Sequence, residues 1–151
     1  MRKSPIPFFA LALVVLAFDQ ITKYYIKAHI GPSDVIPVTS FFNIVYAENT
    51  GSAFGMFKSF GSLFFVIVST SAVIALSIMI MKDAGNRISY SLLLGGAAGN
   101  LLDRILRGYV IDFLDVFAGT HHWPAFNVAD SALSLGIILL LYKAIFPSHH
   151  D

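Results

Sequence analysis

The stretch FGSLFFVIVSTSAVIALSIMIM, residues 60–81, decides the class of fold to which this chain belongs. It contains no charged residue. Its length matches the run of about 20 apolar residues that a helix needs to cross the hydrocarbon core of a bilayer. The sequence therefore predicts a membrane-spanning helix here.

Three further apolar segments accompany this span. Residues 5–27 carry Asp19 and Lys23 within an otherwise apolar run that ends at Lys27, residues 88–106 contain the run LLLGGAAGNLL, and residues 129–147 end in Pro147. Each segment is long enough to cross a bilayer, and its charges fall near its ends. We therefore predict an all-α membrane protein in which a single domain, residues 1–151, contains four transmembrane helices.

The composition agrees with this class. Of the 151 residues, 56% are hydrophobic and 13% are charged, whereas a soluble domain has about 25% charged residues. So few charges cannot cover a globule, which means that lipid must cover part of the surface. The net charge of +1 argues against a nucleic-acid partner, and the absence of cysteine excludes disulfides, thiol nucleophiles and cysteine metal sites.

The N-terminal residues 1–18 have the basic start and apolar middle of a signal peptide. The following run FDQITKYYIK continues the helix, so we expect the first span to be retained. Four spans place both chain ends on one side. The expected sides carry five cations each, so the positive-inside rule does not decide between them. The basic start at Arg2 and Lys3 favours cytoplasmic ends.

Two segments are then expected on the outer side. Residues 28–59 are rich in Val, Ile, Phe and Thr and are interrupted by Pro37 and Gly51, a pattern of short strands and turns. We expect this small β-sheet segment on the membrane surface, because an open sheet edge has no hydrogen-bond partners within lipid. The second outer segment, residues 108–128, is expected to be a connection between two spans.

The third span combines small and polar residues. Gly95 and Gly99 form a small-xxx-small pair that lets another helix pack closely. Three polar residues follow: Asn100, Asp103 and Arg104. Helix packing alone does not require so many polar side chains. Ionisable groups within a membrane segment indicate a functional site. In the first span, by contrast, a charged pair at i and i+4, formed by Asp19 and Lys23, is open to two readings: mutual neutralisation or part of that site.

Five motifs in chain order resemble those of lipoprotein signal peptidase, the bacterial type II signal peptidase. The resemblance covers essentially the whole chain and includes the number of spans. Each motif alone is weak, but five in order are specific. They are DQITK at 19–23, NTGSAFG at 49–55, GNLLDR at 99–104, GYVIDF at 108–113 and FNVADS at 126–131.

The resemblance implies an aspartic endopeptidase of the bacterial inner membrane that needs neither metal nor cofactor. Such an enzyme removes the signal peptide of prolipoproteins just before a cysteine that carries diacylglycerol. The resemblance also implies a small sheet lying on the membrane. The expected partners are prolipoproteins and membrane lipid, with no nucleic acid, and we expect a monomer.

By motif, the resemblance implies that Asp112 and Asp130 are the catalytic pair. It implies a supporting, substrate-binding role for five polar residues. A third carboxylate, Asp115, lies outside the motifs, as does the segment GTHHWP at 119–124, and we expect Asp115 to be a surface group that pairs with Arg107. The five supporting residues are Asp19, Asn49, Asn100, Arg104 and Asn127.

Two carboxylates suit amide hydrolysis because like charges in close contact cannot both ionise and therefore share one proton. One then acts as base towards water and the other as acid towards the carbonyl oxygen. Asp130 near a helix N-terminus is favoured in its ionised form by the helix dipole. Asn127, three residues earlier, has a second interpretation as a helix N-cap only.

Two other functions also place carboxylates near a membrane. A transporter or proton channel has Asp and Arg within its helices, although here the polar groups gather in the outer half. A metalloenzyme would use His121, His122, Asp112 and Asp115, but adjacent loop histidines point in different directions and no HEXXH motif is present.

Overall fold

The structure, a computed structural model, describes residues 4–51 and 61–146. Four helices account for most of it, and their bounds lie within two residues of the predicted spans wherever those spans fall on described residues. A short 3₁₀ turn, Ala84–Asn86, joins the second helix to the third. The helices are α1 (Ile6–His29), α2 (Gly61–Lys82), α3 (Arg87–Arg107) and α4 (Val128–Ile145).

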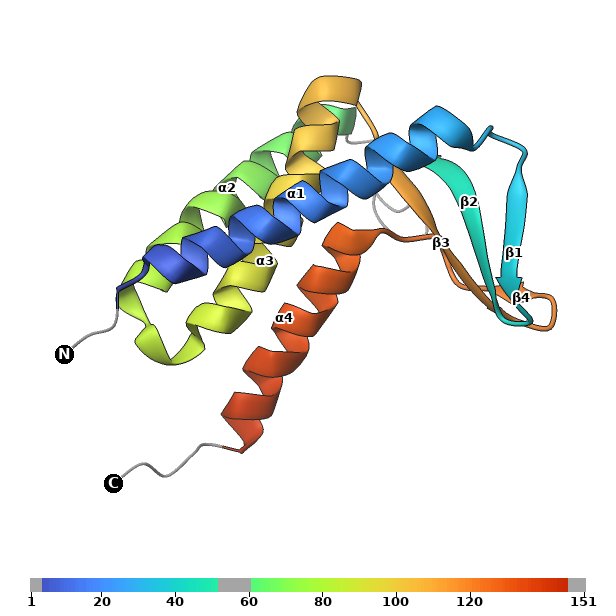
Figure 1. Cartoon of the computed structure of the whole chain (residues 1–151). Helices are drawn as coiled ribbons and strands as arrows, with labels where there is room; N and C mark the ends of the chain where they lie inside the picture. The colour runs from blue at the N-terminus through green and yellow to red at the C-terminus, as the bar shows by residue number, and fades with distance from the viewer. Residues whose placement is uncertain (1–3, 52–60, 147–151) are drawn as a thin grey trace.

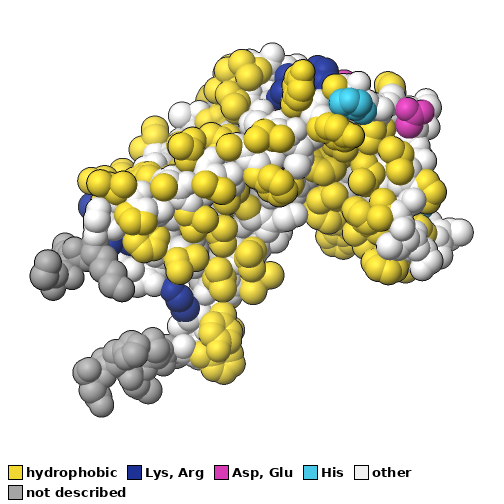
Figure 2. Space-filling model, viewed as in Figure 1, with side chains coloured by type: hydrophobic (Ala, Val, Ile, Leu, Met, Phe, Trp, Pro, Cys, Tyr) yellow, Lys and Arg dark blue, Asp and Glu magenta, His cyan; other side chains and the backbone are white. Residues whose placement is uncertain are grey.

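Three of these helices, α1, α2 and α4, are long and apolar enough to cross a membrane. Their large apolar side chains point outwards, as Leu13, Ile67 and Ile138 do. Figure 2 shows hydrophobic side chains over most of the helical part of the visible face. Water cannot solvate such a surface favourably, so these helices are suited to lipid. The predicted membrane class is confirmed.

The third span, α3, is more polar than the others, and its position among the other three helices permits this. It packs against α1, α2 and α4, and more than half of its residues are buried, among them Asn100 and Asp103. Its polar groups are thus shielded from lipid by the three apolar helices. This arrangement explains why hydropathy alone identifies only α1, α2 and α4 as spans, although α3 belongs to the same bundle of four helices.

Glycines in α3 make the close packing possible. A Cβ atom at Gly95 would lie 2.7 Å from the carbonyl oxygen of Ala12 in α1. A Cβ atom at Gly96 would lie 2.5 Å from the carbonyl oxygen of Ala129 in α4. Backbone atoms cannot yield as a flexible side chain can, so α1 and α4 both depend on glycine here. The predicted packing role of Gly95 is confirmed, and Gly99 likewise faces α1.

A four-stranded antiparallel sheet in the order β1-β2-β3-β4 lies at one end of the bundle (Figure 1). The first two strands come from the segment that was expected to form strands. The others come from residues 108–128, where the expectation of a mere connection was wrong. The strands are β1 (Val35–Thr39), β2 (Phe42–Asn49), β3 (Val110–Ala118) and β4 (His121–His122).

The sequence of β3, VIDFLDVFA, does not show the pattern that is typical of a strand. Its two aspartates are three residues apart, so they fall on opposite faces of the strand, and the alternation of polar and apolar residues is lost. The apolar residues Ile111 and Phe113 pack against Ile26 and Ile30 at the end of α1. This cluster attaches the sheet to the helices, so β3 is held beside the ends of α1, α3 and α4.

Figure 1 shows that α1 begins and α4 ends at the end of the bundle opposite the sheet. The link between α2 and α3 lies at that same end. This arrangement is the one expected of four successive crossings, with the sheet and the N-terminus of α4 together on one side.

Candidate active site

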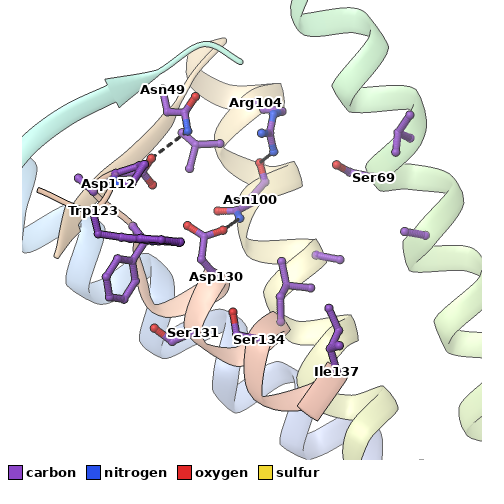
Figure 3. A pocket seen from close by; sticks show the side chains of 18 residues that line it. Asn49, Ser69, Asn100, Arg104, Asp112, Trp123, Asp130, Ser131, Ser134 and Ile137 are labelled. Carbon is purple, nitrogen blue, oxygen red and sulfur yellow. Dashed lines mark hydrogen bonds between the residues drawn. The ribbon is translucent and has the colours of Figure 1, made fainter. Parts of the chain in front are cut away.

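A cavity of about 670 Å³ lies next to the sheet, between α2 and α4. Its helical walls are largely apolar, with Val68, Leu133 and Ile137, and they also contain three serines, Ser69, Ser131 and Ser134. Its polar end contains five of the seven residues that the sequence singled out, and Figure 3 shows the two carboxylates directed at the same part of the cavity. These five are Asn49, Asn100, Arg104, Asp112 and Asp130.

Strand pairing positions Asp112. In the β2–β3 register, Ala47 is opposite Asp112 and Asn49 is opposite Val110. Asn49 and Asp112 are therefore diagonal neighbours on one face of the sheet, and Asn49 Nδ2 donates a hydrogen bond to Asp112 Oδ2 at 3.0 Å. Asp112 is buried, with an exposed fraction of 3% for the whole residue.

The N-terminus of α4 positions Asp130. Asn127 is the N-cap: its Oδ1 accepts a hydrogen bond from the Asp130 backbone N–H at 2.9 Å. The Asp130 side chain accepts one from the Asn127 backbone N–H, which completes a capping box. The remaining carboxylate oxygen of Asp130 accepts from Asn100 Nδ2 at 2.8 Å. Helix capping thus aims this carboxylate into the cavity.

Asn127 is more than a cap. Its Nδ2 donates to Asp112 Oδ1 at 2.6 Å and to Asn100 Oδ1 at 3.2 Å. The side chain has no exposed surface and does not line the cavity. It joins the two carboxylates from behind, because it caps the helix of Asp130 and also donates to Asp112. The cap-only interpretation of Asn127 is therefore wrong.

A buried lysine, Lys23, completes the network. Its Nζ donates to Asn100 Oδ1 at 2.9 Å and forms ion pairs with Asp19 at 2.8 Å and Asp103 at 2.9 Å. An ammonium group can only donate, so the Asn100 oxygen must face Lys23 and its Nδ2 must face Asp130. The sequence showed the pair with Asp19 but not these other contacts. The sequence feature that could have indicated this buried network is the presence of a lysine within an apolar span.

Asp19 lies behind the cavity and not in its wall. It is fully buried, and its Oδ1 accepts a hydrogen bond from the backbone N–H of Ala129 in the first turn of α4 at 2.9 Å. It therefore connects α1 to the helix that carries Asp130. Asp103, also fully buried, pairs with Arg107 as well as with Lys23.

The expectation that Asp115, the third outer carboxylate, is a surface group paired with Arg107 was wrong. Asp115 is buried, with an exposed fraction of 7%. It accepts hydrogen bonds from Asn43 Nδ2 at 2.9 Å and contacts His122 Nδ1 at 2.8 Å. Because strand residues alternate in direction, Asp115 lies on the opposite face of β3 from Asp112.

The environment of Asp112 favours its protonated form. Burial is the larger cause, and the negative charge of Asp130 is the next; together they raise the pKa of the Asp112 carboxyl from 3.8 to about 7. Hydrogen bonds from Asn49 and Asn127 and the positive charge of Lys23 act in the opposite direction. A carboxyl that keeps its proton near neutral pH beside a second carboxylate is the pattern of a proton-sharing pair.

The four residues considered for a metal site do not converge. Within residues 4–51 and 61–146, no group of three or more His, Asp or Glu side chains is placed to hold a metal ion. His122 is paired with Asp115, on the face of β3 that points away from Asp112.

Comparison with known proteins decides the family. A family model described as signal peptidase (SPase) II matches residues 11–146. The chain belongs to the signal peptidase II family. The resemblance that the motifs carry is thereby confirmed, and the protein is a membrane-embedded bacterial protease.

Curated relatives in this family cover nearly the whole chain. A lipoprotein signal peptidase of Thermodesulfovibrio yellowstonii is 50% identical over 130 residues, which are 86% of this chain and 88% of that protein. A lipoprotein signal peptidase of Janthinobacterium sp. (strain Marseille) is 43% identical over 148 residues, covering 94% and 90%. One from Francisella tularensis subsp. novicida is 38% identical, covering 97% and 96%.

The fold of this signal peptidase II family member also matches solved structures. Two chains described as bacterial membrane enzymes are each 35% identical to it. One has a TM-score of 0.84 and covers 96% of this chain and 93% of its own length. The other has a TM-score of 0.81 and covers 94% of both. The architecture of helices and sheet is therefore that of known membrane enzymes.

Proposed function

We propose that the protein is an aspartic endopeptidase that removes the signal peptide of diacylglyceryl-modified prolipoproteins, cleaving before the lipidated cysteine. The observation that carries the proposal is that Asp112 and Asp130 face one cavity between α2 and α4. The relatives named lipoprotein signal peptidase support the choice of substrate.

The proposed reaction uses the two carboxylates as a unit with one shared proton. The ionised carboxylate takes a proton from water, and the oxygen of that water attacks the scissile carbonyl carbon. The protonated carboxyl donates to the carbonyl oxygen. As the tetrahedral intermediate collapses and the C–N bond breaks, the carboxyl that took the proton from water gives it to the leaving nitrogen. The other carboxylate takes back a proton from a hydroxyl of the intermediate, so the pair again holds one proton. Amide donors from Asn49, Asn127 and Asn100 hold the two carboxylates in place.

The lining of the cavity suits such a substrate. Its apolar walls on α2 and α4 suit the signal helix and the acyl chains, which remain in the bilayer. Arg104 and Asn49 line the polar end, and we assign to them contacts with the peptide. Arg104 is already oriented, because its guanidinium lies 5.1 Å from the ring centre of Phe65 and donates to the Gly51 carbonyl oxygen at 3.2 Å.

Asn100, Asp19 and Asn127 receive a different role in this proposal. Asp19 and Asn127 are fully buried, so we assign them to positioning and not to direct substrate contact. Asn100 lines the cavity, but both of its amide atoms are engaged by Lys23, Asn127 and Asp130. We therefore assign it mainly to orienting Asp130.

We further propose that the protein lies in the bacterial inner membrane as a monomer, with both ends cytoplasmic and the sheet and active site periplasmic. The basic start at Arg2 and Lys3 supports cytoplasmic ends. The start of α1 and the end of α4 lie at the same end of the bundle, opposite the sheet (Figure 1). One chain alone provides both carboxylates, which supports a functional monomer.

The proposed function is tested by incubating the purified protein with a prolipoprotein peptide in two forms, with and without diacylglycerol on the cysteine. We expect cleavage before the cysteine in the modified form and little in the unmodified one, because acyl chains anchor the peptide at the membrane surface. Equal turnover of both forms would argue against this placement. Ion flux through liposomes without peptide cleavage would favour the transporter.

We expect cleavage to be independent of a metal ion, since two carboxylates can provide both the base and the acid. The measurement is the cleavage rate of the lipid-modified peptide before and after treatment with EDTA. The rate should be unchanged. Complete loss in EDTA followed by recovery on addition of zinc would overturn this prediction.

The cleavage rate should fall as the pH rises through about 7. The raised pKa of Asp112 keeps the pair singly protonated below that pH, and above it the pair loses the proton that the carbonyl oxygen needs. The measurement is kcat between pH 5 and 9 on a lipidated peptide without ionisable side chains, so that only the enzyme titrates. A flat profile over this range would contradict the shared proton.

A further inference from the structure

The segment 121–126, of which only Phe126 belongs to a family motif, is tied to β3 at both ends. At one end the Trp123 backbone N–H donates to the Val116 carbonyl oxygen at 2.8 Å. At the other, Leu114 and Phe126 exchange backbone hydrogen bonds at 2.8 and 3.0 Å. A segment held in this way presents its side chains in defined directions and loses little entropy when it binds a ligand.

Two buried polar residues, Asn43 and Asp115, fix the near end of this segment through the exposed His122. Asp115 accepts a hydrogen bond from Asn43 and contacts His122, while the His122 ring stacks on Phe117 with ring centres 4.9 Å apart. Residues 115 and 117 share one face of β3 by alternation, and Phe117 is the register partner of His122. The His122 side chain is therefore held on the face that points away from the active site.

The next residue, Trp123, projects to the opposite face. It pairs with Val116, and residues 112, 114 and 116 share the face that carries the catalytic carboxylate. Accordingly, Trp123 lines the cavity together with Asp112, and Figure 3 shows its ring extending into the cavity on the side of Asp112. The side chain has an exposed fraction of 61%. A rigid, exposed aromatic ring is a favourable contact surface for a bound chain.

We propose that Trp123 binds the substrate chain on the mature side of the scissile bond, that is, the residues after the lipidated cysteine, and that Asn43, Asp115 and His122 position it. This inference rests on the proposed function. The signal helix and the acyl chains require the apolar helical walls, whereas the mature chain leaves towards water past the sheet. Among the described residues, Trp123 and Phe126 are the aromatic side chains that line the cavity with Asp112, and Trp123 is the more exposed of the two.

Binding can be observed directly because Trp123 is the only tryptophan in the chain. The measurement uses Asp130→Asn protein, which should bind without cleaving, and two tryptophan-free lipidated peptides. One continues for several residues beyond the cysteine, and the other ends at the cysteine as an amide. The long peptide should change the tryptophan emission and the short one should not. Bound peptides that change the emission equally, or not at all, would overturn the inference.

Kinetics on the same two peptides provide the second test. Trp123→Ala should raise KM for the long peptide by about tenfold, the loss expected of one aromatic anchor, and leave the short peptide unaffected. Trp123→Phe should restore most of the affinity, because a flat ring remains. His122→Ala should show the same selectivity with a smaller rise.

The matched control is Phe41→Ala, which removes an aromatic side chain of 58% exposure in the turn between β1 and β2. Phe41 does not line the cavity, so both peptides should be cleaved as by the unchanged protein. An equal rise in KM for both peptides in Trp123→Ala would identify Trp123 as a membrane-interface anchor and overturn the proposal. If the unchanged protein cleaves neither peptide, the proposed function fails instead.

Discussion

Asp112→Asn and Asp130→Asn should each abolish cleavage, with a loss of about ten-thousand-fold or more in kcat, as for members of other catalytic units. An amide can neither accept a proton from water nor share one with the partner carboxylate. The double variant should be about as inactive as either single one, because residues that act as one unit are not additive. The measurement is single-turnover cleavage of a lipidated peptide at matched concentrations of folded protein.

The folded fraction matters because both oxygens of Asp112 accept hydrogen bonds from side-chain amides. An asparagine there places its own NH₂ group against one of these donors, so thermal unfolding in detergent must accompany the assay. Asp115→Asn is the matched control on the opposite face of the same strand. It should lose less than about tenfold in rate, or about 1.4 kcal/mol of barrier. An inactive Asp115→Asn beside an active Asp112→Asn would show that the wrong pair was chosen.

Lys23→Met should destabilise the protein more than any single change outside the catalytic pair. Lys23 is fully buried between Asp19 and Asp103, and removal of one partner from a buried ion pair costs about 3–5 kcal/mol because charge remains uncompensated. Cleavage should fall too, since the Asn100 oxygen loses its charged donor and keeps only the amide donor of Asn127 among the described residues. The measurements are the unfolding temperature in detergent and kcat of the remaining folded protein.

Lys27→Met is the control for this variant, one helical turn further along α1. Lys27 is exposed, and its Nζ donates only to the Tyr109 hydroxyl at 3.2 Å among the described residues. Such a surface contact contributes little, so unfolding should occur close to the temperature of the unchanged protein. If both variants unfold at the same temperature, the buried network around Lys23 does not contribute to stability as its geometry indicates.

The inner polar network shows where sequence analysis reached its limit. The i, i+4 spacing already indicated the pair of Asp19 and Lys23, and helix geometry alone brings such residues together. The contact of Lys23 with Asn100 joins positions 77 residues apart. It exists because glycines in α3 let α1 pack against its backbone, and no local pattern specifies which side chains then meet.

The outer segment shows the same limit in the sheet. Motif order identified Asp112, but the placement of Asp115 on the surface was wrong, because the strand β3 was not recognised. Once β3 pairs with β2, alternation sends Asp112 to Asn49 and the cavity, and Asp115 to Asn43 and His122. A shift of one residue in the register would exchange these faces.

The sequence by itself determined the membrane class, the four helices and the family, and it supplied the two aspartates that we propose as the catalytic pair, because apolar span length and ordered motifs are properties of the linear chain. The tertiary structure alone decided which polar groups line the cavity and which lie behind it. Asp19 and Asn127 carry the same kind of motif signal as Asn49 and Arg104. They differ in burial, and burial depends on how α1, α3 and α4 pack around Gly95, Gly96 and Gly99.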